Sequence, residues 1–172
     1  MRTLTTYINQ NSVAARFNMV NTAPRELVLI CTDSSEHSLR AFNWYHNHFH
    51  RSEFIVGLVH IYTYPEDQKK LQEVLASNNA VTRKYEELCA QRGITSVLYT
   101  EEKKQCVGQT ICKIAQDNNA SCIVMGQRGL GGLKRAMYGS VSDFVLHHAA
   151  IPVLIVPPQK GGGGGTLRFN ET

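Results

Sequence analysis

The stretch that decides the fold, residues 122–142, reads CIVMGQRGLGGLKRAMYGSVS. It begins with the apolar run 122–125, which predicts a strand buried on both faces. A loop with four glycines follows, and a helical pattern begins at Ser140. Glycine lets the backbone approach a ligand closely, and the start of a helix directs N–H groups at an anion. Strand, glycine loop and helix start together predict a cradle for a phosphate group.

Outward from this stretch, the chain alternates between strands and helices. Apolar runs predict strands at 27–31, 54–61, 122–125 and 152–156. Residues 94–99 alternate between apolar and polar side chains, which predicts a further strand at an edge of the sheet. Helical spacing predicts helices at about 36–50, 67–92, 107–119 and 140–148. This order predicts an α/β fold, a three-layer sandwich in which helices cover both faces of a five-stranded parallel sheet.

The sequence also predicts a helix cap, a possible helix break and a turn. Either Ser34 or Ser35 can cap the helix that follows the first strand. Residues 77–79 are weak helix formers, so the long second helix can kink or break there. The charged residues 101–104 predict a turn.

The ends of the strands hold the candidate ligand contacts. Ligands on open parallel sheets bind beyond the carboxyl ends of the strands, where the strand order reverses. That rule points to Asp33, to His60 and Ile61, and to the glycine loop. Taken alone, Asp33 is also typical of a helix cap or turn, and a glycine loop with basic residues is also typical of a solvated surface turn.

Composition narrows the class of protein. The chain has 172 residues, enough for one domain, and 18 Lys and Arg against 14 Asp and Glu give a net charge of +4. The basic residues are dispersed, so nucleic acid is not expected, and no apolar stretch reaches the ~18 residues of a membrane span. Five cysteines, none in a Cys-x-x-Cys pair, are typical of a reduced, cytoplasmic protein without a zinc site or disulfide framework.

We expect three segments along the chain. Residues 1–24 are rich in Asn and Thr and predict a flexible leader, with organelle targeting as the alternative. Residues 25–158 carry all the expected strands and helices and form the domain. Residues 159–172 contain five consecutive glycines and predict a flexible tail.

The glycine spacing carries a family resemblance. No Gly-x-x-x-x-Gly-Lys-Ser/Thr motif occurs, and Lys134 stands where a Gly-x-Gly-x-x-Gly motif would need its last glycine. The spacing present is Gly126-x-x-Gly129-x9-Gly139-Ser140. It resembles the phosphate and ribose motif of the universal stress protein family, of the kind that binds adenine nucleotides. The resemblance covers residues 26–157 and implies a Rossmann-like fold of the adenine nucleotide alpha hydrolase type.

The resemblance also implies a ligand, its contacts and a partner. Asp33 would accept hydrogen bonds from ribose hydroxyls or support the adenine end, and the backbone of Ile61 would contact the adenine edge. The other implied contacts are Cys31 and Thr32 on the adenine wall, Met125 and Gly126 at the ribose floor, Arg128 and Gly129 facing the phosphates, and Gly139, Ser140, Val141 and Ser142 at the helix start that binds them. The ligand implied is ATP, AMP or ADP, with or without Mg²⁺. A homodimer through Val153–Val156 is implied as well.

Three functions remain open from the sequence. The first is a stress-response or signalling protein that binds an adenine nucleotide without fast catalysis, because no residue pair is typical of an activated nucleophile with its base. The second is a nucleotide-free interaction module that dimerises through its last strand. The third is a slow ATPase in which Asp33 orients a water or a metal. No metal site is expected: His46 and His50 share a helix face, but no acid or cysteine lies at supporting spacing.

Overall fold

The computed structural model describes residues 25–103, 106–127 and 139–158. Along these residues strands and helices alternate: β1 (Leu27–Cys31), α2 (Glu36–His48), β2 (Ile55–Tyr62), α3 (Gln68–Gln91), β3 (Ser96–Glu102), α4 (Val107–Asp117), β4 (Cys122–Gly126), α5 (Ser140–His148) and β5 (Val153–Val156). The strands form one parallel sheet in the order β3-β2-β1-β4-β5. The predicted α/β fold with a five-stranded parallel sheet is therefore confirmed.

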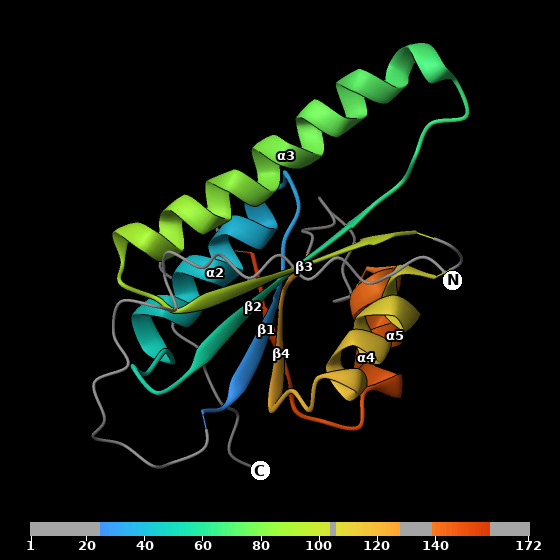
Figure 1. Cartoon of the computed structure of the whole chain (residues 1–172). Coiled ribbons are helices and arrows are strands. Elements are labelled where there is room, and N and C mark those ends of the chain that lie inside the picture. Colours follow the sequence, from blue (N-terminus) through green and yellow to red (C-terminus); the bar gives the residue numbers. More distant parts are fainter. Residues whose placement is uncertain (1–24, 104–105, 128–138, 159–172) are drawn as a thin grey trace, which may run out of the picture.

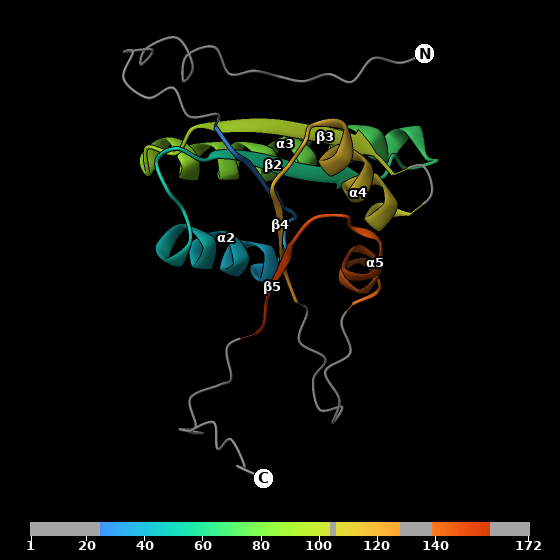
Figure 2. The ribbon, with the colours of Figure 1, turned by 90° about the horizontal axis from the view of Figure 1, so that it is seen from below.

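The sheet is the middle of three layers. Figure 1 shows α2 and α3 on one side of the strands and α4 and α5 on the other, and Figure 2 shows α2 and α5 on opposite sides of β5. Ile30 of β1 belongs to a buried cluster with Tyr45 of α2 and Tyr85 of α3, while its neighbour Leu29 belongs to a second cluster with Ile111 of α4. Successive side chains of a strand point to opposite faces. This burial on both faces explains why β1 reads as a continuous apolar run.

The edge strand β3 differs from its prediction. It lies at one edge of the sheet, as predicted, but it begins at Ser96 and runs to Glu102, so the predicted turn at 101–104 is wrong for its first two residues. Glu101 pairs with Ile61 and Glu102 with Tyr62, at the end of β2. A strand at a sheet edge can place charged side chains in water, so charge did not end it.

The long helix α3 is continuous through residues 77–79, where a break was considered. Val81, Tyr85 and Cys89 of α3 are buried against the sheet, and such packing outweighs weak local helix propensity. The helix ends at Gln91, and Gly93 follows its C-cap with a φ of 67°, the left-handed conformation that commonly terminates helices.

All the described elements lie within the predicted domain, residues 25–158. The predicted leader, 1–24, and the predicted tail, 159–172, lie outside the described residues. Among the helices that the structure describes, none combines the length and the apolar character needed to cross a membrane.

Candidate functional site

A cavity of about 320 Å³ lies at the carboxyl ends of β1 and β4. The strand order reverses between these two strands, since β2 and β3 follow β1 on one side and β5 follows β4 on the other. Parallel α/β sheets bind their ligands at this position. The cavity is lined by Cys31, Thr32, Asp33, Ser35, His37, Ser38, Val59, Ile61, Val107, Ile111, Met125, Gly126, Gly139, Ser140, Val141 and Ser142.

Ten of the twelve residues that the sequence predicts line this one cavity. They come from the segment after β1, the end of β2, the end of β4 and the start of α5. The two others, Arg128 and Gly129, lie outside the described residues, as does the rest of the glycine loop to residue 138. Sequence reasoning missed six lining residues: Ser35, His37, Ser38, Val59, Val107 and Ile111.

The lining divides by element into an apolar part and a polar part. Val59, Ile111 and Met125 belong to the buried cluster between the sheet and α4, with Cys31 and Ile61 packed against it, so the apolar part is the end of that core. The polar part comes from the segment after β1, the first turn of α2 and the first turn of α5. A mostly apolar hollow with a few convergent polar groups is typical of a small-molecule site.

Asp33 organises the polar wall after β1. Its Oδ1 accepts hydrogen bonds from the Ser35 amide at 2.8 Å, from the Ser35 hydroxyl, and from the Ser38 hydroxyl at 2.7 Å. Ser35 is the N-cap of α2 and accepts from the Ser38 amide at 3.3 Å, which decides between the two predicted caps. The turn role considered for Asp33 is therefore correct, and the same bonds hold its carboxylate in one orientation at the cavity wall.

Thr32, by contrast, uses its polar groups within the sheet. Its amide donates to the Val59 carbonyl at 2.8 Å and its hydroxyl donates to the same oxygen at 3.1 Å. Thr32 is 5% exposed. Its role at the cavity wall is therefore to extend the β1–β2 ladder up to Asp33.

The start of α5 lacks the cap that α2 has. Its N-cap is Gly139, which makes no side-chain cap bond, and the first helical bond runs from the Asp143 amide to the Gly139 carbonyl at 2.9 Å. The amides of the first helical turn, at Ser140, Val141 and Ser142, precede that bond. The Ser142 hydroxyl donates to the Gly139 carbonyl at 3.0 Å. The first amides of α5 therefore lie at the cavity, and no side chain of the N-cap residue caps them.

Two glycines of the motif have different surroundings. A Cβ on Gly126 would lie 2.1 Å from the backbone oxygen of His37 and 2.4 Å from its carbonyl carbon. A Cβ on Gly139 would meet nothing nearer than the Ser142 hydroxyl, at 3.9 Å. The close approach of α2 therefore requires glycine at Gly126, whereas no described part of the chain requires it at Gly139.

Arg40 of α2 fixes the beginning of the glycine loop. Its Nη2 donates to the Gln127 carbonyl at 2.8 Å, and the Gln127 amide donates to the Val156 carbonyl of β5 at 2.9 Å. Gln127 is thus held from both sides. This anchoring places a guanidinium beside the point where the loop leaves β4.

Cys31 is a lining residue without nucleophilic character. Burial, reinforced by the negative charge of Asp33, raises the pKa of its thiol to about 12. A thiol in this state is neutral at physiological pH, and only the thiolate is a good nucleophile. All five cysteines of the chain are free in the structure, which agrees with the absence of a disulfide framework expected from the sequence.

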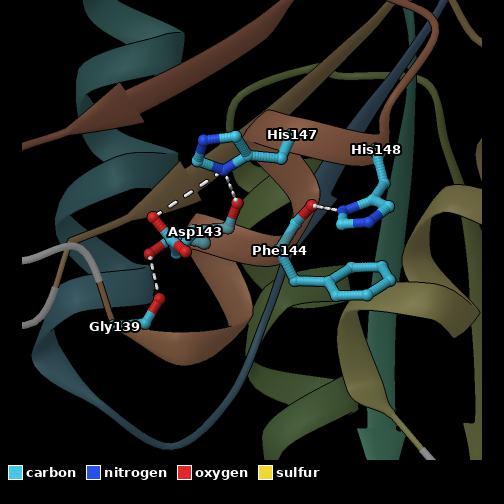
Figure 3. A network of polar contacts seen from close by, with 6 residues as sticks. Gly139, Asp143, Phe144, His147 and His148 are labelled. Atoms are coloured by element: carbon cyan, nitrogen blue, oxygen red, sulfur yellow. Dashed lines mark hydrogen bonds and ion pairs between the residues drawn. The ribbon is translucent and has the colours of Figure 1, made fainter.

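His147 and His148 lie in the last turn of α5. Nδ1 of His147 donates to the Asp143 carbonyl and Nδ1 of His148 to the Phe144 carbonyl, each at 2.8 Å, as Figure 3 shows. The rings of His46 and His50 are 6.1 Å apart. Within residues 25–103, 106–127 and 139–158, no group of three His, Cys, Asp or Glu residues could hold a metal ion.

The fold and the cavity together define the class of protein, which is an open parallel α/β protein. Its cavity lies where the strand order reverses, and the N-terminus of α5, which no side chain caps, lies beside it. The model of the universal stress protein family matches residues 25–157, and the chain belongs to this family. The family resemblance inferred from the glycine spacing is confirmed.

Curated relatives carry the same family name. Universal stress protein YxiE of Bacillus subtilis is 30% identical over 103 residues, which cover 59% of this chain and 67% of YxiE. Universal stress protein Slr1101 of Synechocystis is 44% identical over 50 residues, 29% of this chain and 46% of Slr1101. The match thus spans less than half the length of Slr1101.

Solved structures share the fold. A universal stress protein family protein from Arabidopsis thaliana with AMP bound superposes with a TM-score of 0.60 at 21% identity, over 77% of this chain and 91% of that chain. A universal stress protein in complex with cAMP superposes with a TM-score of 0.57 at 20% identity, over 78% of this chain and 98% of that chain.

Proposed function

We propose that this protein binds an adenine nucleotide, ATP or else AMP or ADP, in the cavity between β1 and β4, and that it acts in stress response or signalling through this binding. The observation that carries the proposal is the start of α5. Its first amides have no side-chain cap and belong to residues that line the cavity, and the missing side chain of Gly139 leaves space there that packing within the described chain does not explain. A helix N-terminus of this kind suits a phosphate group, because amide donors and the helix dipole act in the same direction. The AMP and cAMP bound to two structural neighbours support the same ligand class.

The other lining residues fit the remaining parts of the ligand. The apolar part of the cavity, with Val59, Ile111 and Met125, offers a surface for the base. The oriented carboxylate of Asp33 accepts from hydroxyl donors such as those of ribose. The volume of about 320 Å³ lies at the lower end of small-molecule sites, which run from about 300 to 1,000 Å³. We further propose that Arg128 and Gly129 of the glycine loop contact the phosphates, and that Mg²⁺ can accompany ATP there.

The cavity favours binding over fast chemistry. Three donors already contact Oδ1 of Asp33, and burial keeps the Cys31 thiol neutral, so neither group is an activated nucleophile. A slow ATPase, with Asp33 orienting a water, is the alternative within the same site. A turnover well above background that disappears in Asp33→Ala would establish that alternative.

We also propose a homodimer through β5. This strand lies at an edge of the sheet, pairs with β4 on one side, and carries only apolar residues, Val153–Val156. An unpaired strand edge is a template for pairing with a second copy. Light scattering after size exclusion tests it, and a monomer at micromolar concentration would contradict it. For the place of action we propose the cytoplasm, with the five free thiols as support.

The decisive experiment identifies the ligand. Purified protein is denatured and any released nucleotide is analysed, and calorimetry then measures the affinity for ATP, ADP and AMP with and without Mg²⁺. Gly139→Val places a branched side chain where the phosphates are expected and should abolish binding while the sheet stays folded. Ala150→Val, which enlarges an exposed residue beyond the far end of α5, is the matched control and should bind as the wild type does.

The outcomes separate the functions. Protein that releases no nucleotide and shows no affinity for any of the three would refute the proposal and favour the nucleotide-free dimeric module. Undiminished binding by Gly139→Val would also refute the proposed place of the phosphates. Bound ligand should in addition raise the unfolding temperature by mass action.

A further inference from the structure

Helix α3 contributes no residue to the cavity lining, yet two of its polar side chains are linked to the segment that carries Asp33, through Ser38 and through His60. Asn78 and Tyr85 are seven residues apart, close to two turns, so they share one face of α3. Val81, between them on that face, is buried in the core. A face that packs on a sheet gains stability from apolar groups. Packing on the sheet therefore does not explain why α3 carries polar groups at Asn78 and Tyr85.

The first contact runs from Tyr85 through Ser38 to Asp33. The Tyr85 hydroxyl lies 2.8 Å from the Ser38 hydroxyl, which lies 2.7 Å from Oδ1 of Asp33. The carboxylate can only accept, so Ser38 donates to Asp33 and accepts from Tyr85. The Tyr85 hydroxyl also lies 3.5 Å from the Asp33 carbonyl. Burial raises the pKa of Tyr85 to about 12, so its hydroxyl keeps its proton at physiological pH.

The second contact runs from Asn78 through His60 to Thr32. His60 of β2 is 5% exposed, and its Nδ1 lies 3.0 Å from the Thr32 carbonyl. That carbonyl can only accept, so Nδ1 of His60 donates. Nε2 of the same ring lies 3.3 Å from Oδ1 of Asn78. Because Nδ1 carries the proton of a neutral ring, Nε2 accepts, and the Asn78 amide donates to it from its NH₂ group when the amide is turned by 180°. Asn78 thereby fixes the ring that holds the residue before Asp33.

We propose that α3 is a positioning element for the ligand site: Tyr85 and Asn78, acting through Ser38 and His60, hold Thr32 and Asp33 in the orientation that binds the ribose hydroxyls. The ribose part rests on the proposed function. The two contacts hold neighbouring residues from one helix, and a turn of the Asp33 carboxylate would break its hydrogen bond from Ser38. Tyr85 and Asn78 are positioning residues, because neither lines the cavity.

Tyr85→Phe tests the first contact. It removes one hydroxyl and keeps the ring that packs edge-on against Phe42, with the ring centroids 5.5 Å apart. We expect the affinity for ATP to fall by about two- to tenfold, the range of a neutral hydrogen bond, because the Tyr85 hydroxyl donates to the Ser38 hydroxyl. The affinity for 2′,3′-dideoxy-ATP, which lacks both ribose hydroxyls, should not change. Tyr99→Phe, which removes a hydroxyl from half-buried Tyr99 on the opposite face of the sheet, is the matched control.

Asn78→Leu tests the second contact. Leucine is the better helix former and adds apolar contact at this half-buried position, which offsets the loss of the partner of Nε2 of His60, so the variant should resist urea about as well as the wild type. Its affinity for ATP should nevertheless fall by about two- to tenfold, the range of a neutral hydrogen bond. A loss of affinity without a matching loss of stability distinguishes a positioning role from a merely structural one.

A ligand-free measurement separates this proposal from the proposed function. Hydrogen exchange of the Ser35 amide, which donates to Asp33, should be faster in Tyr85→Phe than in the wild type. If the wild type binds no nucleotide, the ribose role falls with the proposed function, and unchanged exchange would overturn the positioning contact as well. If the wild type binds, equal losses for ATP and dideoxy-ATP in Tyr85→Phe, or no loss at all, would overturn the proposal.

Discussion

Replacing Gly126 with alanine adds one methyl group, and we expect it to destabilise the fold. The added Cβ would lie 2.1 Å from the His37 oxygen, and this oxygen would have to retreat to at least 3.4 Å, the lower end of ordinary contact. The obstacle is backbone in the first turn of α2, so no side-chain rotation can relieve it. Either the end of β4 or the start of α2 has to move.

The expected cost follows from the kind of atom that is displaced. Overpacking that shifts backbone costs about 1–3 kcal/mol, and a backbone obstacle this close places Gly126→Ala at about 3 kcal/mol. The φ of Gly126 is not in the left-handed region, so alanine also gains about 0.5–1 kcal/mol by restricting the unfolded chain. A net loss of about 2 kcal/mol should lower the urea midpoint by about 1 M, for a slope near 2 kcal/mol/M.

Gly139→Ala is the matched control within the same motif. Its Cβ meets nothing nearer than 3.9 Å, and the φ of −60° suits alanine. Its stability should therefore stay within about 1 kcal/mol of the wild type, the range of a lost glycine N-cap and a restricted unfolded chain. Its affinity for ATP should fall, because the methyl group enters the cavity. An unchanged urea midpoint for Gly126→Ala, or a larger stability loss in Gly139→Ala, would refute the reasoning.

Three further predictions concern stability. Ser35→Ala removes the side chain that accepts from the Ser38 amide at the start of α2 and should lower the free energy of unfolding by about 1 kcal/mol in urea. Gly108→Ala brings a Cβ to 2.6 Å from Cδ1 and 3.0 Å from Cβ of Phe144, a contact that rotation of the ring does not remove, so a loss of about 1–3 kcal/mol is expected by thermal unfolding. The Cys31 thiol has a pKa raised from 9.0 to about 12, so the unfolded chain releases its proton first and stability should fall as pH rises from 9 to 12. Cys31→Ala should flatten that alkaline decline.

The sequence predicts those elements best whose burial is uniform. β1 and α5 have the predicted bounds, because a strand buried on both faces and a helix that follows directly on a glycine leave little ambiguity. The predictions were poorer for β3, which continues through Glu101 and Glu102, and for the residues 77–79 of α3. In both places the neighbouring elements decide the outcome, through pairing with β2 and packing on the sheet. No local residue pattern carries that information.

The lining of the cavity, too, could be predicted only in part from local sequence patterns. The predicted lining residues lie at strand ends and in one glycine motif, where topology brings distant segments together. Val107 and Ile111 were missed, because nothing in the sequence shows that the first turns of α4 face the carboxyl end of β1. Their spacing of four residues marks a helix face, but the element opposite that face is known only from the fold.

The motif itself joins two separate physical requirements. Gly126 is needed because α2 packs against the end of β4, so it would be needed in a protein of this fold that bound nothing. Gly139 has no such reason within the described chain, and its value lies in the room it leaves beside the amides of α5. A chain with the first glycine and a bulky residue at the second would keep the fold and lose the proposed phosphate position. The residue at Gly139, more than the glycine loop as a whole, therefore carries the information about the ligand.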